Sequence, residues 1–225
     1  MVEKILTRFK TTLRKGYSKI EQINYPNPAL KRQVKDGQFH LTTRQCNKLI
    51  SKSDTMRDAL VMRILIETGI RREEVSKLQT INFFQKKKSL VVIGKGNKER
   101  IIPVTNELNQ SLKFYLADSK QGKKGYLFPS RQSNCKNSPI RVETVNEIVK
   151  RAGVNADIKN PNPRLKHLNP HLLRHTFAHK WKHLGMSWDK LAMVMGHESV
   201  STTINIYGLP NYEEVEKFMK EKNPL

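Results

Sequence analysis

Four separated segments of the chain carry residue types that can act together on a phosphate group. Arginine presents a permanently charged, planar fork of hydrogen-bond donors, and lysine and histidine can move protons. A tyrosine hydroxyl becomes a nucleophile once a neighbouring group removes its proton. The segments are 68–75 (TGIRREEV), 94–100 (GKGNKER), 171–175 (HLLRH) and 195–197 (MGH), the last followed by Tyr207. Their residue types suit phosphate binding, proton transfer and nucleophilic attack.

Each segment taken alone also has a plain structural explanation. Arg71 stands beside Arg72 and two glutamates, a pattern typical of a helix start on a solvated face. The GKGNKE stretch looks like a phosphate-binding loop, but it lacks the spacing of a Walker motif and leads into β-branched residues. Tyr207 alone would be an ordinary packing residue. The chemical interpretation therefore depends on the combination.

Four histidines recur at intervals of four residues, which raises the alternative of a metal site: His171, His175, His179 and His183. Each step of four overshoots a helical turn by about 40°, so the first and last lie about 120° apart. Leu172 stands where a zinc-protease helix carries glutamate, and Arg174 would repel a cation. We therefore expect no metal ion. His175 is expected to make structural hydrogen bonds beside the site, and His179 and His183 to lie at the surface.

The composition points to a polyanionic partner. The 225 residues include 42 Lys and Arg against 20 Asp and Glu, a formal net charge of +22. Repulsion of that size destabilises a compact chain unless a polyanion lies nearby, and nucleic acid is the obvious one. The sequence has no apolar run near the ~20 residues that span a bilayer, and two cysteines, Cys46 and Cys135, are too few for a disulfide framework. We expect an intracellular protein, cytoplasmic or nucleoid-associated, that binds nucleic acid.

The apolar pattern predicts a mainly α domain with a small three-stranded antiparallel sheet. Strands are expected at 81–84, 90–93 and 100–104, with a hairpin turn at 94–99. Helices are expected at 42–50, 56–66, 71–78, 107–117, 142–152, 171–184, 188–195 and 213–221. The large apolar residues of the later helices are expected in the core: Phe177, Trp181, Leu184, Trp188, Met193 and Met195.

Taken in order, the four segments resemble the tyrosine recombinase (phage integrase) family, and the resemblance covers about residues 41–208. GKGNKER before a strand, and HLLRHTFA, are especially similar to bacterial Xer-type members. The resemblance implies the mainly helical catalytic fold of these DNA breaking-and-rejoining enzymes. It implies a site-specific DNA recombinase or integrase that cuts and rejoins double-stranded DNA through a 3′-phosphotyrosyl intermediate and a Holliday junction, with no metal, ATP or cofactor.

The resemblance also assigns roles. Arg71 and Arg174 would clamp the attacked phosphate, and Tyr207 would be the nucleophile. Lys95 would protonate the leaving 5′-oxygen, with Lys98 as its substitute. His171 and His197 would assist proton transfer and hold the phosphate. Further DNA contacts are expected from four residues: Arg72, Lys98, Arg100 and His175.

Two features depart from the family pattern. His197 and Tyr207 are ten positions apart, one more than in most relatives. One extra residue turns a helical position by ~100°, so we expect a loop or bulge at 201–203 to absorb it, with Tyr212 as the alternative nucleophile. Whether Tyr207 acts in its own subunit or in a neighbour's stays open. Relatives also usually carry a helical core-binding domain, whereas here a basic arm at 1–37, a candidate remnant of that region, precedes the catalytic domain at 38–225. The protein is either naturally minimal or a fragment.

The resemblance further implies a homotetramer on two DNA sites, with accessory DNA-bending proteins as further partners. A helix at 211–222 would pass to a neighbouring subunit or fold back on its own domain. A mobile-element integrase and a chromosome-dimer resolvase both fit. Three other functions stay open: type IB topoisomerase-like relaxation of supercoils, a catalytically idle DNA-binding protein, and a basic RNA-binding or ribosome-associated protein. The last would explain the charge and leave the four segments unexplained.

Overall fold

A computed structural model describes residues 39–119, 125–131, 138–197 and 200–207 of the chain. For Lys95 and for 205–207 it describes the backbone and leaves the side chains undescribed. The expected arm at 1–37, the expected helix at 211–222, Cys135 and Tyr212 lie outside the described residues.

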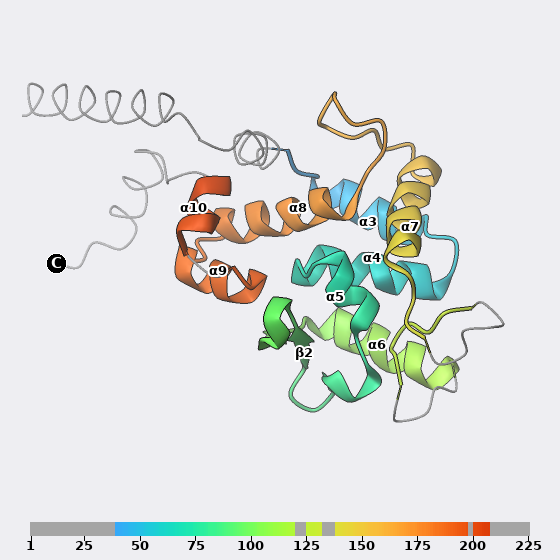
Figure 1. Ribbon diagram of the computed structural model, residues 1–225. Helices are drawn as coiled ribbons and strands as arrows, with labels where there is room; N and C mark the ends of the chain where they lie inside the picture. Colours follow the sequence, from blue (N-terminus) through green and yellow to red (C-terminus); the bar gives the residue numbers. More distant parts are fainter. Residues whose placement is uncertain (1–38, 120–124, 132–137, 198–199, 208–225) are drawn as a thin grey trace, which may run out of the picture.

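One buried helix organises the domain. Helix α4 (Met56–Thr68) contacts α3 (Thr43–Ser51), α5 (Arg72–Lys77), α6 (Asn106–Asp118), α7 (Val142–Asn155) and α8 (Pro170–His183), which surround it in Figure 1. A helix that is apolar on most of its faces is stable only when other elements cover it, as here. Val61, Met62, Ile64 and Leu65 of α4 are completely buried. No helix in the described part of the chain is long and apolar enough to cross a membrane.

The sheet confirms the expected fold class. Strands β1 (Phe83–Phe84), β2 (Ser89–Ile93) and β3 (Glu99–Pro103) pair antiparallel in the order β1-β2-β3. The first strand is shorter than expected, because 80–82 form a 3₁₀ turn in which the Asn82 side chain accepts a hydrogen bond from the backbone of Gln79. The β2–β3 turn closes where the Gly94 N–H donates to the Lys98 carbonyl at 2.8 Å.

Local signals place several helix ends close to where the sequence predicts them. Thr42 and Gln45 form a capping box at the start of α3, which satisfies two backbone groups that the helix itself leaves unpaired. Gly69 ends α4 in the left-handed conformation. Arg71 is the N-cap of α5. Helix α9 spans Trp188–Met195, as expected.

The expectation of a loop or bulge at 201–203 is wrong. These residues belong to the first turn of a continuous helix, α10 (Val200–Tyr207), which packs against α9. Thr203 is completely buried, so burial of this face favours a regular helix at this point.

Part of the expected core is at the surface. Phe177 and Met195 are buried together in a small second cluster, against which Trp188 packs. Leu184, Met193 and Trp181 are 76%, 67% and 37% exposed. The reason is geometric: the cluster and the neighbouring elements cover only part of the surface of α8 and α9, and these three side chains lie outside the covered part. His179 is also less exposed than expected, since its ring stacks on that of His40 at 4.4 Å.

Candidate active site

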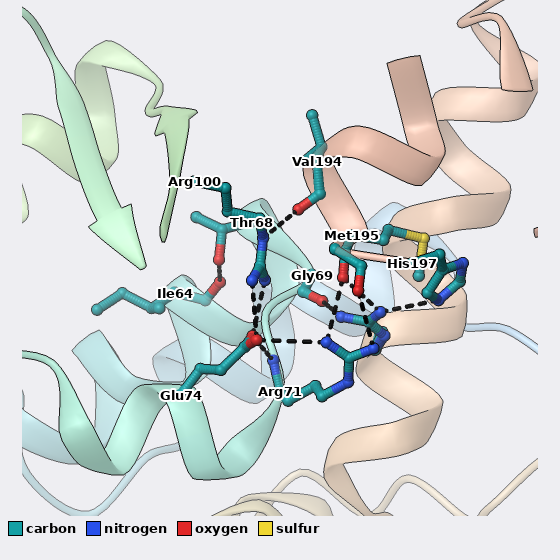
Figure 2. Close-up of polar contacts among 11 residues, drawn as sticks. Ile64, Thr68, Gly69, Arg71, Glu74, Arg100, Val194, Met195 and His197 are labelled. Atoms are coloured by element: carbon teal, nitrogen blue, oxygen red, sulfur yellow. Dashed lines mark hydrogen bonds and ion pairs between the residues drawn. The ribbon is translucent and has the colours of Figure 1, made fainter. Parts of the chain in front are cut away.

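Three arginines from different parts of the chain converge on the C-terminal end of α9 (Figure 2). Arg100 Nε donates to the Val194 carbonyl at 2.8 Å, and Arg174 Nη2 donates to the Met195 carbonyl at 2.7 Å. Arg71 Nη2 reaches the Gly196 carbonyl at 3.2 Å. The last carbonyls of a helix have no partner within it and form the negative end of its dipole. The end of α9 therefore gathers the guanidinium groups.

Arg174 connects the C-terminal ends of two helices, α4 and α9. It lies on α8 and is 6% exposed. Its Nη1 donates to the Gly69 carbonyl at the end of α4 at 2.6 Å, while Nη2 holds the end of α9. Gly69 has φ +63°, and a Cβ atom there would lie 2.4 Å from the ring of Phe177. Glycine at this position allows α4 to end close enough for Arg174 to reach it.

Arg71 is hydrogen-bonded to Glu74, and its side chain remains partly exposed. Its backbone N–H donates to Glu74 Oε2 at 2.7 Å, and its Nη1 lies 3.3 Å from Glu74 Oε1. Its side chain is still 36% exposed. Arg71 can therefore bind a ligand without first leaving its protein partners.

Glu74 is a site residue that sequence reasoning missed. Both of its oxygens pair with Arg100, at 2.8 and 2.7 Å, and both side chains are buried. Burial alone would raise the pKa of Glu74, but hydrogen bonds and charge from Arg100, with a smaller contribution from Arg71, lower it overall. The carboxylate is ionised and anchors two arginines. The sequence feature that could have identified Glu74 is its position three residues after Arg71, where a glutamate often caps the start of a helix.

Arg100 and Arg72, both expected at the DNA, have protein partners. The Arg100 guanidinium is committed to Glu74 and the Val194 carbonyl, and its side chain is 11% exposed. This geometry favours a role in holding the site over a direct contact with DNA. Arg72 pairs with Glu73 and donates to Asn146 of α7 at 3.1 Å.

His197 lies between Arg174 and α10. Its Nε2 is 2.9 Å from Arg174 Nη2, and its Nδ1 is 2.7 Å from the hydroxyl oxygen of Thr203. Burial, followed by the charges of Arg174 and Arg71, lowers the pKa of His197 to about 3. The imidazole is therefore neutral near pH 7.

The other two site histidines lie on α8. His171 is exposed at the first turn, with its ring centroid 6.4 Å from that of His175. Desolvation by the surrounding protein, then Arg174 and Arg72, lower the pKa of His171. Burial and the neighbouring His171 lower the pKa of His175 to about 3. Both are neutral near pH 7, and both line a cavity of about 210 Å³.

A larger cavity of about 750 Å³ is lined by Arg71 and Arg100. It extends from the β2–β3 turn to the C-terminal end of α9 and the first turn of α10. Its lining includes Arg71, Glu74, Gly94, Lys98, Arg100, Gly196, His197 and Thr202. Lys95 stands in the turn at its edge, and Tyr207 is the last residue of α10; the side chains of both lie outside the described part of the structure. Among described residues, no three His, Cys, Asp or Glu side chains gather as a metal site would require.

The mainly helical fold, its small sheet and the arginine–histidine cluster at the end of α9 define the class that the four sequence segments resemble. The chain belongs to the phage integrase family, the tyrosine recombinases: the family model matches residues 40–214.

Individual relatives agree with this membership. The chain is 32% identical over 223 residues to the tyrosine recombinase XerA of Pyrococcus furiosus, covering 94% of this chain and 72% of that protein. It is 28% identical over 200 residues to a tyrosine recombinase of Pseudothermotoga lettingae, covering 87% of this chain but 65% of that protein. The crystal structure of XerA recombinase superposes with a TM-score of 0.64 at 26% identity, over 83% of this chain and 65% of that one. The chain thus spans about two thirds of the length of these relatives.

Proposed function

We propose that the protein is a site-specific recombinase that cuts and rejoins double-stranded DNA through a covalent 3′-phosphotyrosyl intermediate. The observation that carries the proposal is the cluster of Arg71, Arg174 and His197 around one helix end. These groups come from three distant segments, and each lies within hydrogen-bond distance of that end or of another member. Two guanidiniums held at one helix end beside a neutral imidazole offer several donors to the oxygens of one phosphate.

The first step is a transesterification. The phosphate enters the 750 Å³ cavity, which Arg71 and His197 line. Arg71 binds its non-bridging oxygens there, and Arg174, which contacts His197 from the buried side, is the second arginine of the clamp. The oxygen of Tyr207 attacks phosphorus, the bond to the 5′-oxygen breaks, and that oxygen takes a proton from Lys95. One phosphoester bond replaces another, so the step requires no ATP. Arginines in other phosphoryl-transfer sites contribute roughly 10³–10⁵ in rate.

The second step reverses the first with a new strand. The free 5′-hydroxyl of a partner DNA attacks the phosphotyrosyl bond, and the tyrosine leaves. Exchange of one pair of strands produces a Holliday junction, and exchange of the second pair resolves it. Four protomers on two DNA sites would supply the four tyrosines. The basic arm at 1–37 would add phosphate contacts, and the helix at 211–222 would link neighbouring subunits.

The neutral histidines fit proton transfer. Because the pKa values of His171 and His197 are lowered, each ring is uncharged at neutral pH and has one nitrogen that accepts a hydrogen. A neutral imidazole can take the proton that Tyr207 loses, whereas an imidazolium cannot. His171, which is exposed, is the better candidate for this role, because both ring nitrogens of His197 have partners in Arg174 and Thr203.

Covalent trapping tests the proposal. A nicked suicide substrate should produce a protease-sensitive protein–DNA adduct with the wild type and with Tyr212→Phe, and none with Tyr207→Phe. An adduct lost only in Tyr212→Phe would overturn the nucleophile assignment. No adduct with any variant, despite salt-sensitive DNA binding, would favour a binding protein. Plasmids with and without paired sites then separate recombination from the alternative, type IB topoisomerase-like relaxation, which needs no paired site.

A further inference from the structure

Thr203 joins the catalytic cluster to the helix that ends in Tyr207. Its hydroxyl oxygen lies 2.7 Å from His197 Nδ1, and the residue is completely buried in the first turn of α10. Because the Thr203 hydroxyl is buried, losing its partner in His197 would leave a buried polar group unpaired, so the contact is expensive to break.

The partners of His197 determine which of its nitrogens carries the hydrogen. A guanidinium has donors and no acceptor, so Arg174 Nη2 can bond to Nε2 only if Nε2 is an acceptor. A neutral ring then carries its hydrogen on Nδ1, which donates to the Thr203 hydroxyl. Burial keeps the pKa of His197 at about 3, so a second ring proton is absent at neutral pH.

We propose that Thr203 is a positioning residue: by accepting the Nδ1–H of His197, in the tautomer that Arg174 selects, it fixes the orientation of the ring and holds α10 in register with Arg174. The proposal rests on the recombinase function proposed above and adds a residue to that site. It gives His197 the part of an acceptor in the DNA-free protein, in place of a donor to phosphate.

The position of Thr203 on α10 makes this contact effective. Tyr207 follows Thr203 by four residues in the same continuous helix, slightly more than one helical turn. A helix transmits rotation and translation along its axis, so a bond one turn before its last residue constrains where that residue stands. Because this chain has one extra position between His197 and Tyr207, a fixed point within α10 would help to set its register.

The test uses three variants. Thr203→Val keeps the shape and removes the acceptor, Thr203→Ser keeps the hydroxyl, and Thr43→Val makes the same substitution at an exposed residue of α3. Adduct formation on the suicide substrate should slow about ten- to hundredfold in Thr203→Val, the usual loss when a partner that orients a functional ligand is removed. Thr203→Ser and Thr43→Val should react as the wild type does, and all should bind DNA equally.

A second measurement reads the tautomer directly. Long-range ¹H–¹⁵N spectra of the histidine rings, with His197 assigned by its loss in His197→Gln, should show hydrogen on Nδ1 in the wild type. In Thr203→Val this Nδ1–H signal should shift, because it has lost its hydrogen-bond acceptor. Hydrogen on Nε2 in the wild type, or an unchanged spectrum in Thr203→Val, would overturn the proposal. So would a Thr203→Ser variant as slow as Thr203→Val, because packing would then explain both. If the wild type forms no adduct, the recombinase function fails while the spectra still decide the role of Thr203.

Discussion

A side chain at Gly196 would collide with Arg100: a Cβ atom built there would lie 2.8 Å from Arg100 Nη1. The same glycine has φ +65° and ends α9 in the left-handed conformation. The glycine before His197 is therefore needed twice, for the backbone turn and for the close approach of a guanidinium that is itself fixed by Glu74.

Replacing Gly196 should separate these two requirements. Gly196→Ala is expected to lower the free energy of unfolding by about 1–2 kcal/mol, because alanine is strained in left-handed backbone. Displacing Arg100 should lower it further. Gly185→Ala is the matched control, because Gly185 has φ +83° and open space around its Cβ position. Urea unfolding should show a larger loss for Gly196→Ala, and only this variant should slow adduct formation. Equal losses and equal activity would mean that the collision with Arg100 is relieved at no cost.

Removing the charge of Glu74 should destabilise the whole site. Glu74→Gln leaves Arg100 buried beside a neutral partner, and breaking a buried ion pair from one side costs about 3–5 kcal/mol. Glu73→Gln is the control, since the Glu73 pair with Arg72 is half exposed and such pairs contribute about 0–1 kcal/mol. Chemical denaturation measures both variants. A Glu74→Gln variant as stable as Glu73→Gln would show that Arg100 finds another partner.

Stability should fall as the pH is lowered below about 6.5, the ordinary pKa of histidine. The unfolded chain takes up protons at His175 and His197 near that pH, whereas in the folded chain their pKa values are about 3. The unfolded state thus binds more protons across this window, and stability rises with pH through it. His175→Gln should flatten the loss between pH 7 and pH 5 by the contribution of one proton. Parallel curves for the variant and the wild type would contradict the lowered pKa of His175.

The two arginines should respond differently to lysine. Arg174 makes three contacts from a buried position, and a single ammonium cannot reproduce that planar arrangement, so Arg174→Lys should reduce both stability and cleavage. Arg71 is partly exposed, so Arg71→Lys should leave the free energy of unfolding nearly unchanged while cleavage falls by roughly 10³-fold or more. Single-turnover cleavage and urea unfolding on the same preparations test this. Equal destabilisation by both variants would contradict it.

Much of the fold could be predicted because its signals are local. The capping box at Thr42, the left-handed Gly69 and the apolar α4 each act within a few residues, so the chain itself specifies those boundaries. The membership of the family followed from four short segments for a similar reason: their residue types and order are visible without knowing how they meet. Helix α10 was not predicted, although Val200, Ile204 and Tyr207 stand at helical spacing, because it is short and rich in Ser, Thr, Asn and β-branched residues, which have low helix propensity.

By itself, then, the sequence determined most of the secondary structure around the site, with α10 as the exception, and the cationic character of its side chains. Only the tertiary structure decided how those side chains are used. Arg100 pairs with Glu74; Leu184 and Met193 were expected in the core and are exposed; and the Nδ1 of His197 faces Thr203. Each outcome depends on which groups lie within about 3 Å across distant segments, and a guanidinium or an imidazole takes its partner from that geometry, which no local pattern encodes.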